Sequence, residues 1–117
     1  MKDFKKLVVW QVGMEIVDKV YELMVFLPNE EKYGLRSQMT RSAISIPSNI
    51  AEGSAKKSVK EQVRFVEIAL GSAFELETQS LVVQKRKWIE ELVIDELIEL
   101  IRREQRMISK FIEKLEG

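Results

Sequence analysis

Three glutamates are the residues of this chain best suited to catalysis or metal binding. Glu52, Glu75 and Glu77 lie in stretches with helical spacing, and carboxylate oxygens are the ligands that Mg²⁺ prefers. Glutamates on adjacent turns are common in any helix, however, and di-iron sites in helical bundles also need a Glu-x-x-His motif. The chain has no His and no Cys, which removes the commonest general base and all thiolate chemistry. We therefore expect no enzyme, no metal site and no cofactor.

Nine basic residues are candidates for contacts with nucleic acid. The formal net charge is zero, so any attraction for phosphate must be local. Lys and Arg outnumber acidic residues between positions 30 and 64, whereas acidic residues outnumber them between 88 and 117. Ordinary solvated charge is the alternative explanation for such clusters. The candidates are Arg36, Arg41, Lys56, Lys57, Lys60, Arg64, Lys85, Arg86 and Lys87.

A polar stripe with three- or four-residue spacing runs from position 38 to position 56. Ordinary solvated helix faces are rich in Lys and Glu, whereas this stripe contains Ser and Asn, which have poor propensity for helix interiors. We therefore predict side-chain partners other than water, and a solvated face is the alternative. The predicted structural network consists of Gln38, Arg41, Ser45, Asn49, Glu52 and Glu75.

The length and hydropathy of the chain indicate a single domain, residues 1–117. Hydrophobic residues make up 45% of the sequence, which is enough for one globular core. The apolar runs are too short to span a membrane, and the first residues lack the apolar stretch of a signal peptide. We expect a cytoplasmic protein with no membrane partner.

Four segments have the apolar periodicity of helices, at 3–27, 34–55, about 59–86 and about 91–115. Pro28 should end the first, and Ser58 with Glu61 forms a capping box before the third. No segment alternates with period two, so we expect no sheet. Long helices joined by short links predict an all-α, antiparallel up-down four-helix bundle. In the third helix the residues expected to face inward are Val59, Val63, Val66, Leu70, Ala73 and Leu81.

Pro47 stands inside the second of these segments. A proline there removes one backbone donor and presses its ring towards the carbonyl of Ala43. The apolar spacing keeps its phase on both sides, so we predict one continuous helix that is kinked at Pro47. The alternative is a helix that restarts at Asn49, with Glu52 completing an Asn-x-x-Glu cap.

Second apolar rows on three helices indicate that a further face is buried. The simplest explanation is contact with other subunits, and a wide core stripe is the alternative. Gly71 favours contact with other subunits, because a mid-helix glycine costs about 1 kcal/mol and calls for a packing reason. The second rows are Trp10, Met14, Val17, Tyr21 and Met24; Phe65, Ala69, Ser72, Leu76 and Val83; and Val93, Leu100 and Met107.

Several motifs resemble a known family. They are Leu7-Val8-Val9-Trp10-Gln11, Tyr33-Gly34-Leu35, the block from Gln38 to Gly53 that contains Ser45-Ile46-Pro47-Ser48-Asn49-Ile50-Ala51-Glu52-Gly53, and Ala69-x-Gly71-Ser72-x-x-Glu75-Leu76-Glu77-Thr78. They resemble the four-helix-bundle proteins encoded in intervening sequences of bacterial 23S ribosomal RNA genes, over nearly the whole chain. The resemblance implies a barrel-shaped homopentamer. It also implies kinship with the accessory variability proteins of diversity-generating retroelements, which bind a reverse transcriptase and nucleic acid.

Two functions follow from the residues and the resemblance together. The first is a non-enzymatic oligomeric scaffold that binds RNA or DNA, with multivalency raising the affinity of a modest basic patch. The second is a protein–protein adaptor without direct nucleic-acid contact, which docks through Glu75, Glu77 and the acidic fourth helix.

Overall fold

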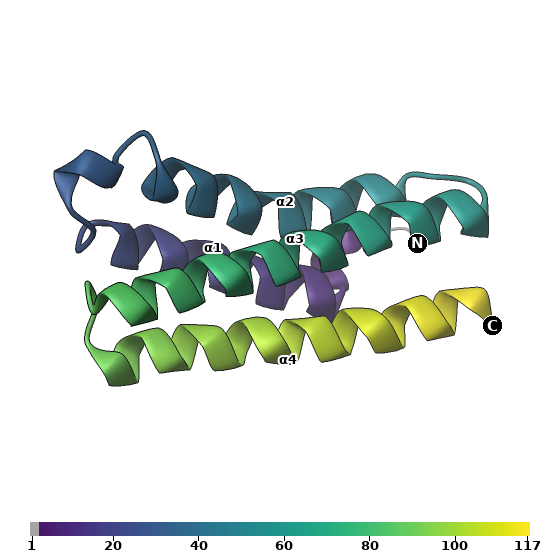
Figure 1. Ribbon diagram of the computed structural model, residues 1–117. Coiled ribbons are helices and arrows are strands. Elements are labelled where there is room, and N and C mark those ends of the chain that lie inside the picture. The colour runs from purple at the N-terminus through teal and green to yellow at the C-terminus, as the bar shows by residue number, and fades with distance from the viewer. Residues whose placement is uncertain (1–2) are drawn as a thin grey trace.

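The computed structural model describes residues 3–117, which form four long helices. These are α1 (Val8–Met24), α2 (Leu35–Ser54), α3 (Val59–Arg86) and α4 (Glu91–Glu116), with short 3-10 turns η1 (Phe4–Lys6) and η2 (Asn29–Glu31). No strand occurs among the described residues. The helices run alternately up and down in an elongated bundle of 43 × 24 × 20 Å (Figure 1). The predicted all-α up-down bundle is confirmed.

The bundle closes because each helix packs against its neighbours. α2 contacts α1 and α3, α3 contacts α4, and α4 returns to contact α1. The α1–α2 connection and the α3–α4 turn lie at one end of the molecule, and the α2–α3 turn lies at the other (Figure 1). No helix among residues 3–117 is long and apolar enough to cross a membrane.

The helix ends follow local signals in the sequence. The Ser58 hydroxyl accepts a hydrogen bond from the backbone N–H of Glu61 at 3.1 Å, which caps α3. This is half of the predicted capping box, because among residues 3–117 the Glu61 carboxylate forms no return bond to Ser58. Lys87 adopts a left-handed backbone conformation (φ 58°) and ends α3. The first helix is shorter than predicted. Leu7 has an extended backbone that separates η1 from α1, and α1 already ends at Met24, before Pro28.

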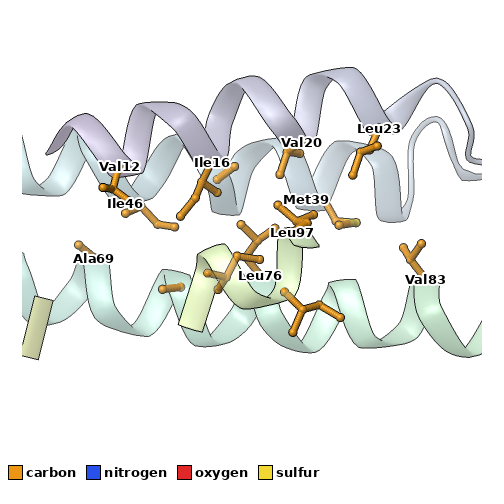
Figure 2. Packing of buried hydrophobic residues seen from close by; sticks show 14 of the residues in the cluster. Val12, Ile16, Val20, Leu23, Met39, Ile46, Ala69, Leu76, Val83 and Leu97 are labelled. Carbon is orange, nitrogen blue, oxygen red and sulfur yellow. The ribbon is translucent and has the colours of Figure 1, made fainter. Parts of the chain in front are cut away.

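The core is a continuous apolar cluster to which all four helices contribute. Figure 2 shows Val12, Ile16, Val20, Leu23, Met39, Ile46, Ala69, Leu76, Val83 and Leu97 within it. In α3 the predicted inward row is only partly correct, because Val59 is 49% exposed. Ala69, Leu76 and Val83, from the second row, are fully buried instead. Since α3 lies between α2 and α4, its buried stripe is wide, and that row is not available for contacts between subunits.

Helix α2 passes through Pro47 without interruption, from Leu35 to Ser54. The alternative with a restart at Asn49 is therefore wrong. Pro47 is buried, and the kink expected there remains a prediction. Near the end of α2, a Cβ atom on Gly53 would lie 3.0 Å from the Cβ of Phe65 and 3.2 Å from the carbonyl oxygen of Gln62. Glycine at this position lets α2 and α3 approach closely beside their connecting turn.

Candidate nucleic-acid interface

Four of the nine candidate basic residues gather at the α2–α3 turn. Lys57, Lys60 and Arg64 are exposed and Lys56 is half-buried. The Lys56 ammonium lies 4.9 Å from the centre of the Phe65 ring, and the Arg64 guanidinium lies 5.9 Å from it. Both are within the range of cation–π attraction, so one aromatic ring positions two cations. We call Lys56, Lys57, Lys60 and Arg64 the turn cluster.

The turn that carries this cluster is held by side-chain hydrogen bonds. Gln62 donates through Nε2 to the carbonyl oxygen of Lys56 at 2.9 Å, and Ser58 caps α3 one turn earlier. None of the four cations forms an ion pair with a described residue. The turn cluster therefore presents positive charge on an ordered support.

Acidic side chains lie beside the turn cluster and reduce its field. A groove between the start of α3 and the end of α4 is lined by Lys60 and Arg64 but also by Glu61, Glu67 and Glu116. In a single chain, therefore, the positive potential is local and short-ranged.

Lys85, Arg86 and Lys87 form a second basic group, at the opposite end of the bundle. All three are exposed at the carboxyl end of α3, where cations complement the helix dipole. At a rise of about 1.5 Å per residue, Lys60 and Lys85 lie about 37 Å apart along α3. The nine candidates therefore do not form one surface.

Arg36 and Arg41 occupy different environments on α2. Arg36 is half-buried and donates through Nη2 to the carbonyl oxygen of Leu27 at 3.0 Å, which ties the α1–α2 connection to α2. Its Nε is buried without a hydrogen-bond partner among residues 3–117. Arg41 is exposed, and its side chain contacts no described hydrogen-bond or ion-pair partner. Only Arg41 of these two is free to reach a ligand.

The polar network of α2 is smaller than the sequence suggested. The Ser45 hydroxyl lies 2.7 Å from the Ser72 hydroxyl on α3, and Asn49 donates through Nδ2 to the carbonyl and hydroxyl oxygens of Ser45 at 2.8 and 2.9 Å. These three residues join α2 to α3. The other predicted members have exposed side chains without hydrogen bonds to residues 3–117; they are Gln38, Arg41, Glu52 and Glu75.

A second polar network, which the sequence did not reveal, joins α3 to α4. Glu77 accepts a hydrogen bond from Gln105 Nε2 at 2.7 Å and an ion-paired hydrogen bond from Arg102 Nε at 2.9 Å. The hydrogen bond from Gln105, helped by Arg102, holds the pKa of Glu77 below its ordinary value against the opposing effect of burial. Arg102 also reaches Glu99 at 3.3 Å. Glu77 therefore links α3 to α4 through these hydrogen bonds.

Six polar side chains among the described residues are buried, and none was predicted from the sequence as a partner or a site. They are Ser42, Ser72, Gln79, Ser80, Glu104 and Gln105. Glu104 is fully buried, and the signal for it was present. The inward positions Leu97, Ile101 and Ile108 follow helical spacing, and the same row passes through residue 104.

Residues 3–117 contain no group of three acidic side chains that could hold a metal ion.

The fold and these surfaces define a small four-helix bundle whose polar contacts mainly join its own helices. Residues 5–110 match the family described as 23S rRNA-intervening sequence protein. Because the match covers most of the sequence, the chain belongs to this family, as the resemblance of its motifs predicted.

A solved structure supports the architecture independently. The chain is similar to a protein of unknown function from the S23 ribosomal protein family of Bacteroides thetaiotaomicron VPI-5482, known from its crystal structure. The TM-score is 0.82 at 21% identity, and the alignment covers 89% of this chain and 97% of that one. At this identity the likeness establishes the fold alone. No curated protein gives a significant match.

Proposed function

We propose that this protein is a non-enzymatic, self-associating scaffold of the cytoplasm that binds structured RNA through phosphate contacts. The turn cluster is the observation that carries this proposal, because two of its cations pack on the Phe65 ring and none of the four is neutralised by an ion pair with a described residue. The resemblance of the motifs supports a nucleic-acid ligand, because it implies kinship with proteins that bind nucleic acid.

In this proposal, self-association raises the affinity of the turn cluster for RNA. One cluster holds four cations beside Glu61, Glu67 and Glu116, which is a weak phosphate site. Several copies arranged around a ring would present several such sites to one RNA, and the effective concentration of each further contact would then be high. The resemblance of the motifs implies five copies.

An apolar groove between α1 and α2 supports the proposed self-association. It has a volume of about 280 Å³, and Met14 and Ile44 on its walls are 38% and 41% exposed. Trp10 and Val17 are half-buried there. The full lining is Trp10, Met14, Val17, Ile44, Pro47, Ser48 and Ala51. Trp10, Met14 and Val17 of this lining belong to the second apolar row on α1.

The outer face of α3 offers a complementary surface. Ile68 and Phe74 are 42% and 52% exposed, and they flank Gly71 one turn before and after it. Apart from the backbone of α3 itself, no atom of residues 3–117 lies within 4 Å of the position that a Cβ on Gly71 would occupy, so packing among the described residues does not explain this glycine. In the proposed assembly, α3 of one copy packs against the α1–α2 groove of the next. Such head-to-tail contacts close into a ring when the rotation permits.

The RNA-binding proposal is tested by titrating a fluorescent RNA hairpin at several salt concentrations. The variant K57Q/K60Q/R64Q removes three charges from the turn cluster. The control K19Q/R106Q/K110Q removes three exposed cations elsewhere. The turn-cluster variant should bind at least about tenfold more weakly at low salt. The slope of its log affinity against log salt should become shallower by about 0.7–0.9 for each phosphate that is no longer neutralised. The control should change little.

The opposite basic end and the choice of nucleic acid are tested in the same assay. K85Q/R86Q/K87Q shows whether the second basic group contributes, and a DNA hairpin of matching sequence shows whether the 2′-hydroxyl matters. Failure of the unaltered protein to bind RNA even at low salt would overturn the proposal. The adaptor function would then be favoured, although Glu77 is already engaged by Gln105 and Arg102.

A further inference from the structure

Glu104 is a buried carboxyl group in the middle of the bundle. The side chain is fully inaccessible, and neither carboxylate oxygen has a hydrogen-bond partner among residues 3–117. Burying a charge without a partner is among the most costly arrangements in a protein, and such a group takes up a proton instead. Glu104 therefore differs from Glu77, which is ionised and held by Gln105 and Arg102.

The carboxyl of Glu104 lies where three helices meet. A Cβ atom built on Gly13 of α1 would be 3.2 Å from Glu104 Oε2, 3.4 Å from Ile46 Cγ2 and 3.4 Å from Pro47 Cβ. Gly13 thus leaves the space into which the carboxyl of α4 fits, at the point where Ile46 and the buried Pro47 of α2 also approach α1. Any change in the size or hydration of this carboxyl acts directly on the contact of α1 with α2 and α4.

The charges around Glu104 are few. Arg103, next to it on α4, favours ionisation, and Glu15 of α1 opposes it. The segment of α2 from Ser42 to Ile50 carries no titratable side chain. On α3, residues 68–74 carry none either, although this segment lies level with Gln105, whose Nε2 reaches the carbonyl oxygen of Ala73. Burial therefore dominates and raises the pKa of Glu104 from its ordinary 4.5 to about 8.

We infer that Glu104 is a proton-controlled lock on the junction of α1, α2 and α4. The neutral carboxyl lets the three helices close around it. When the carboxyl releases its proton to solvent, the charge that remains demands hydration, and α1 loosens from the bundle. No catalytic step is involved, and the lock acts on the single chain whether or not RNA is bound.

The pH range follows from the two states of the group. Between about pH 4.5 and about pH 8 the folded chain holds the proton and the unfolded chain does not. Stability therefore falls as the pH rises through this range, by up to tenfold in the unfolding equilibrium constant per pH unit, and then levels off. Glutamine at position 104 is nearly isosteric and cannot ionise, so it should lack this component.

The test is urea unfolding of the unaltered chain and of Glu104→Gln at fixed protein concentration, from about pH 5 to about pH 9. The unfolding constant of the unaltered chain, divided by that of Glu104→Gln, should rise by up to tenfold per pH unit until about pH 8 and then level off. Glu96→Gln, an exposed substitution on α4, should show the same dependence of stability on pH as the unaltered chain. A ratio that does not vary with pH would overturn the proposal. If Glu104→Gln does not fold, Glu104→Met supplies the neutral reference.

Two spectroscopic measurements separate the lock from a merely structural role. Infrared spectra of the unaltered chain near neutral pH should show the band of a protonated carboxyl, which should be missing in Glu104→Gln. Hydrogen exchange should show α1 amides losing protection at alkaline pH in the unaltered chain more than in the variant, after correction for intrinsic rates. An ionised Glu104 near neutral pH would refute the lock.

Discussion

Gly13 of α1 and Glu104 of α4 approach so closely that a single added methyl group on Gly13 would lie 3.2 Å from the Glu104 carboxyl. The same methyl group would also meet Ile46 and Pro47 of α2. One glycine therefore sets the spacing of three helices around a buried acid. There is little space for a larger side chain at position 13.

Gly13→Ala should destabilise the bundle. Alanine gains up to about 1 kcal/mol in helix propensity, but crowding a buried junction costs about 1–3 kcal/mol. We expect a net loss of about 1 kcal/mol in the free energy of unfolding, measured by urea titration. An unchanged or raised stability would show that α1 can shift without cost.

Gly71→Ala is the matched control on α3. The added methyl group meets no described atom within 4 Å outside the backbone of α3, so this variant should gain up to about 1 kcal/mol in a monomeric chain. Both glycine variants are best compared in a background carrying Ile44→Glu, which we expect to be monomeric. In the assembling protein, Gly71→Ala should weaken self-association if α3 packs closely on a neighbour.

Ser72→Ala should lower the free energy of unfolding by about 1 kcal/mol, because the buried hydroxyl bonded to Ser45 is removed. A double-mutant cycle with Ser45→Ala measures the coupling between the two hydroxyls directly. Ser109→Ala, at an exposed position on α4, should change stability by less than about 0.5 kcal/mol. A zero coupling would show that the hydrogen bond between Ser45 and Ser72 adds no stability.

Glu77→Gln should destabilise the bundle at neutral pH by about 1 kcal/mol and have little effect in acid. The folded pKa of Glu77 is lowered by Gln105 and Arg102, so its contribution is present above about pH 4.5 and is lost as the pH falls through the folded pKa. Urea unfolding at several pH values measures this, with the exposed Glu75→Gln as control. If Glu77→Gln lowered the free energy of unfolding equally at neutral and acid pH, the claim that ionised Glu77 stabilises the bundle would be contradicted.

Ile44→Glu should abolish self-association, because it places a charge in the α1–α2 groove that we assign to the contact between copies. Light scattering should give a mass of about five times 13.6 kDa for the unaltered protein and one chain mass for the variant. Leu92→Glu is the control, since Leu92 is 70% exposed at the start of α4 and lies outside both surfaces. A monomeric unaltered protein would contradict the proposed assembly.

Sequence patterns predicted the helices well where local chemistry marks their ends. Ser58 identified the first turn of α3, and the unbroken apolar phase through Pro47 identified α2 as one helix. The start of α1 was missed because Phe4–Lys6 also shows helical spacing, and only the extended backbone at Leu7 separates it from α1. Periodicity cannot reveal that single break.

The polar contacts were harder to predict, because they depend on which helix faces which. Ser45 and Asn49 were recognised from their poor helix propensity, but Ser72 was seen only as a small residue. Glu104 lies in the inward row of α4, but the sequence does not show whether another helix supplies a hydrogen-bond partner for its carboxyl group. The basic residues were grouped by charge, but the turn cluster and Lys85–Lys87 lie at opposite ends of the long helix α3 and do not meet.

Trp10 lies half-buried in the α1–α2 groove. The centre of its ring is 5.4 Å from the centre of the Phe4 ring, and the two rings pack edge to face. Indole emission shifts to shorter wavelength when water leaves the ring, so the protein carries its own fluorophore at the surface where copies are expected to meet. The other tryptophan, Trp88, lies by the α3–α4 turn, so the measurement uses a Trp88→Phe variant in which Trp10 is the remaining tryptophan. Dilution of that variant then reads out dissociation optically, without any label.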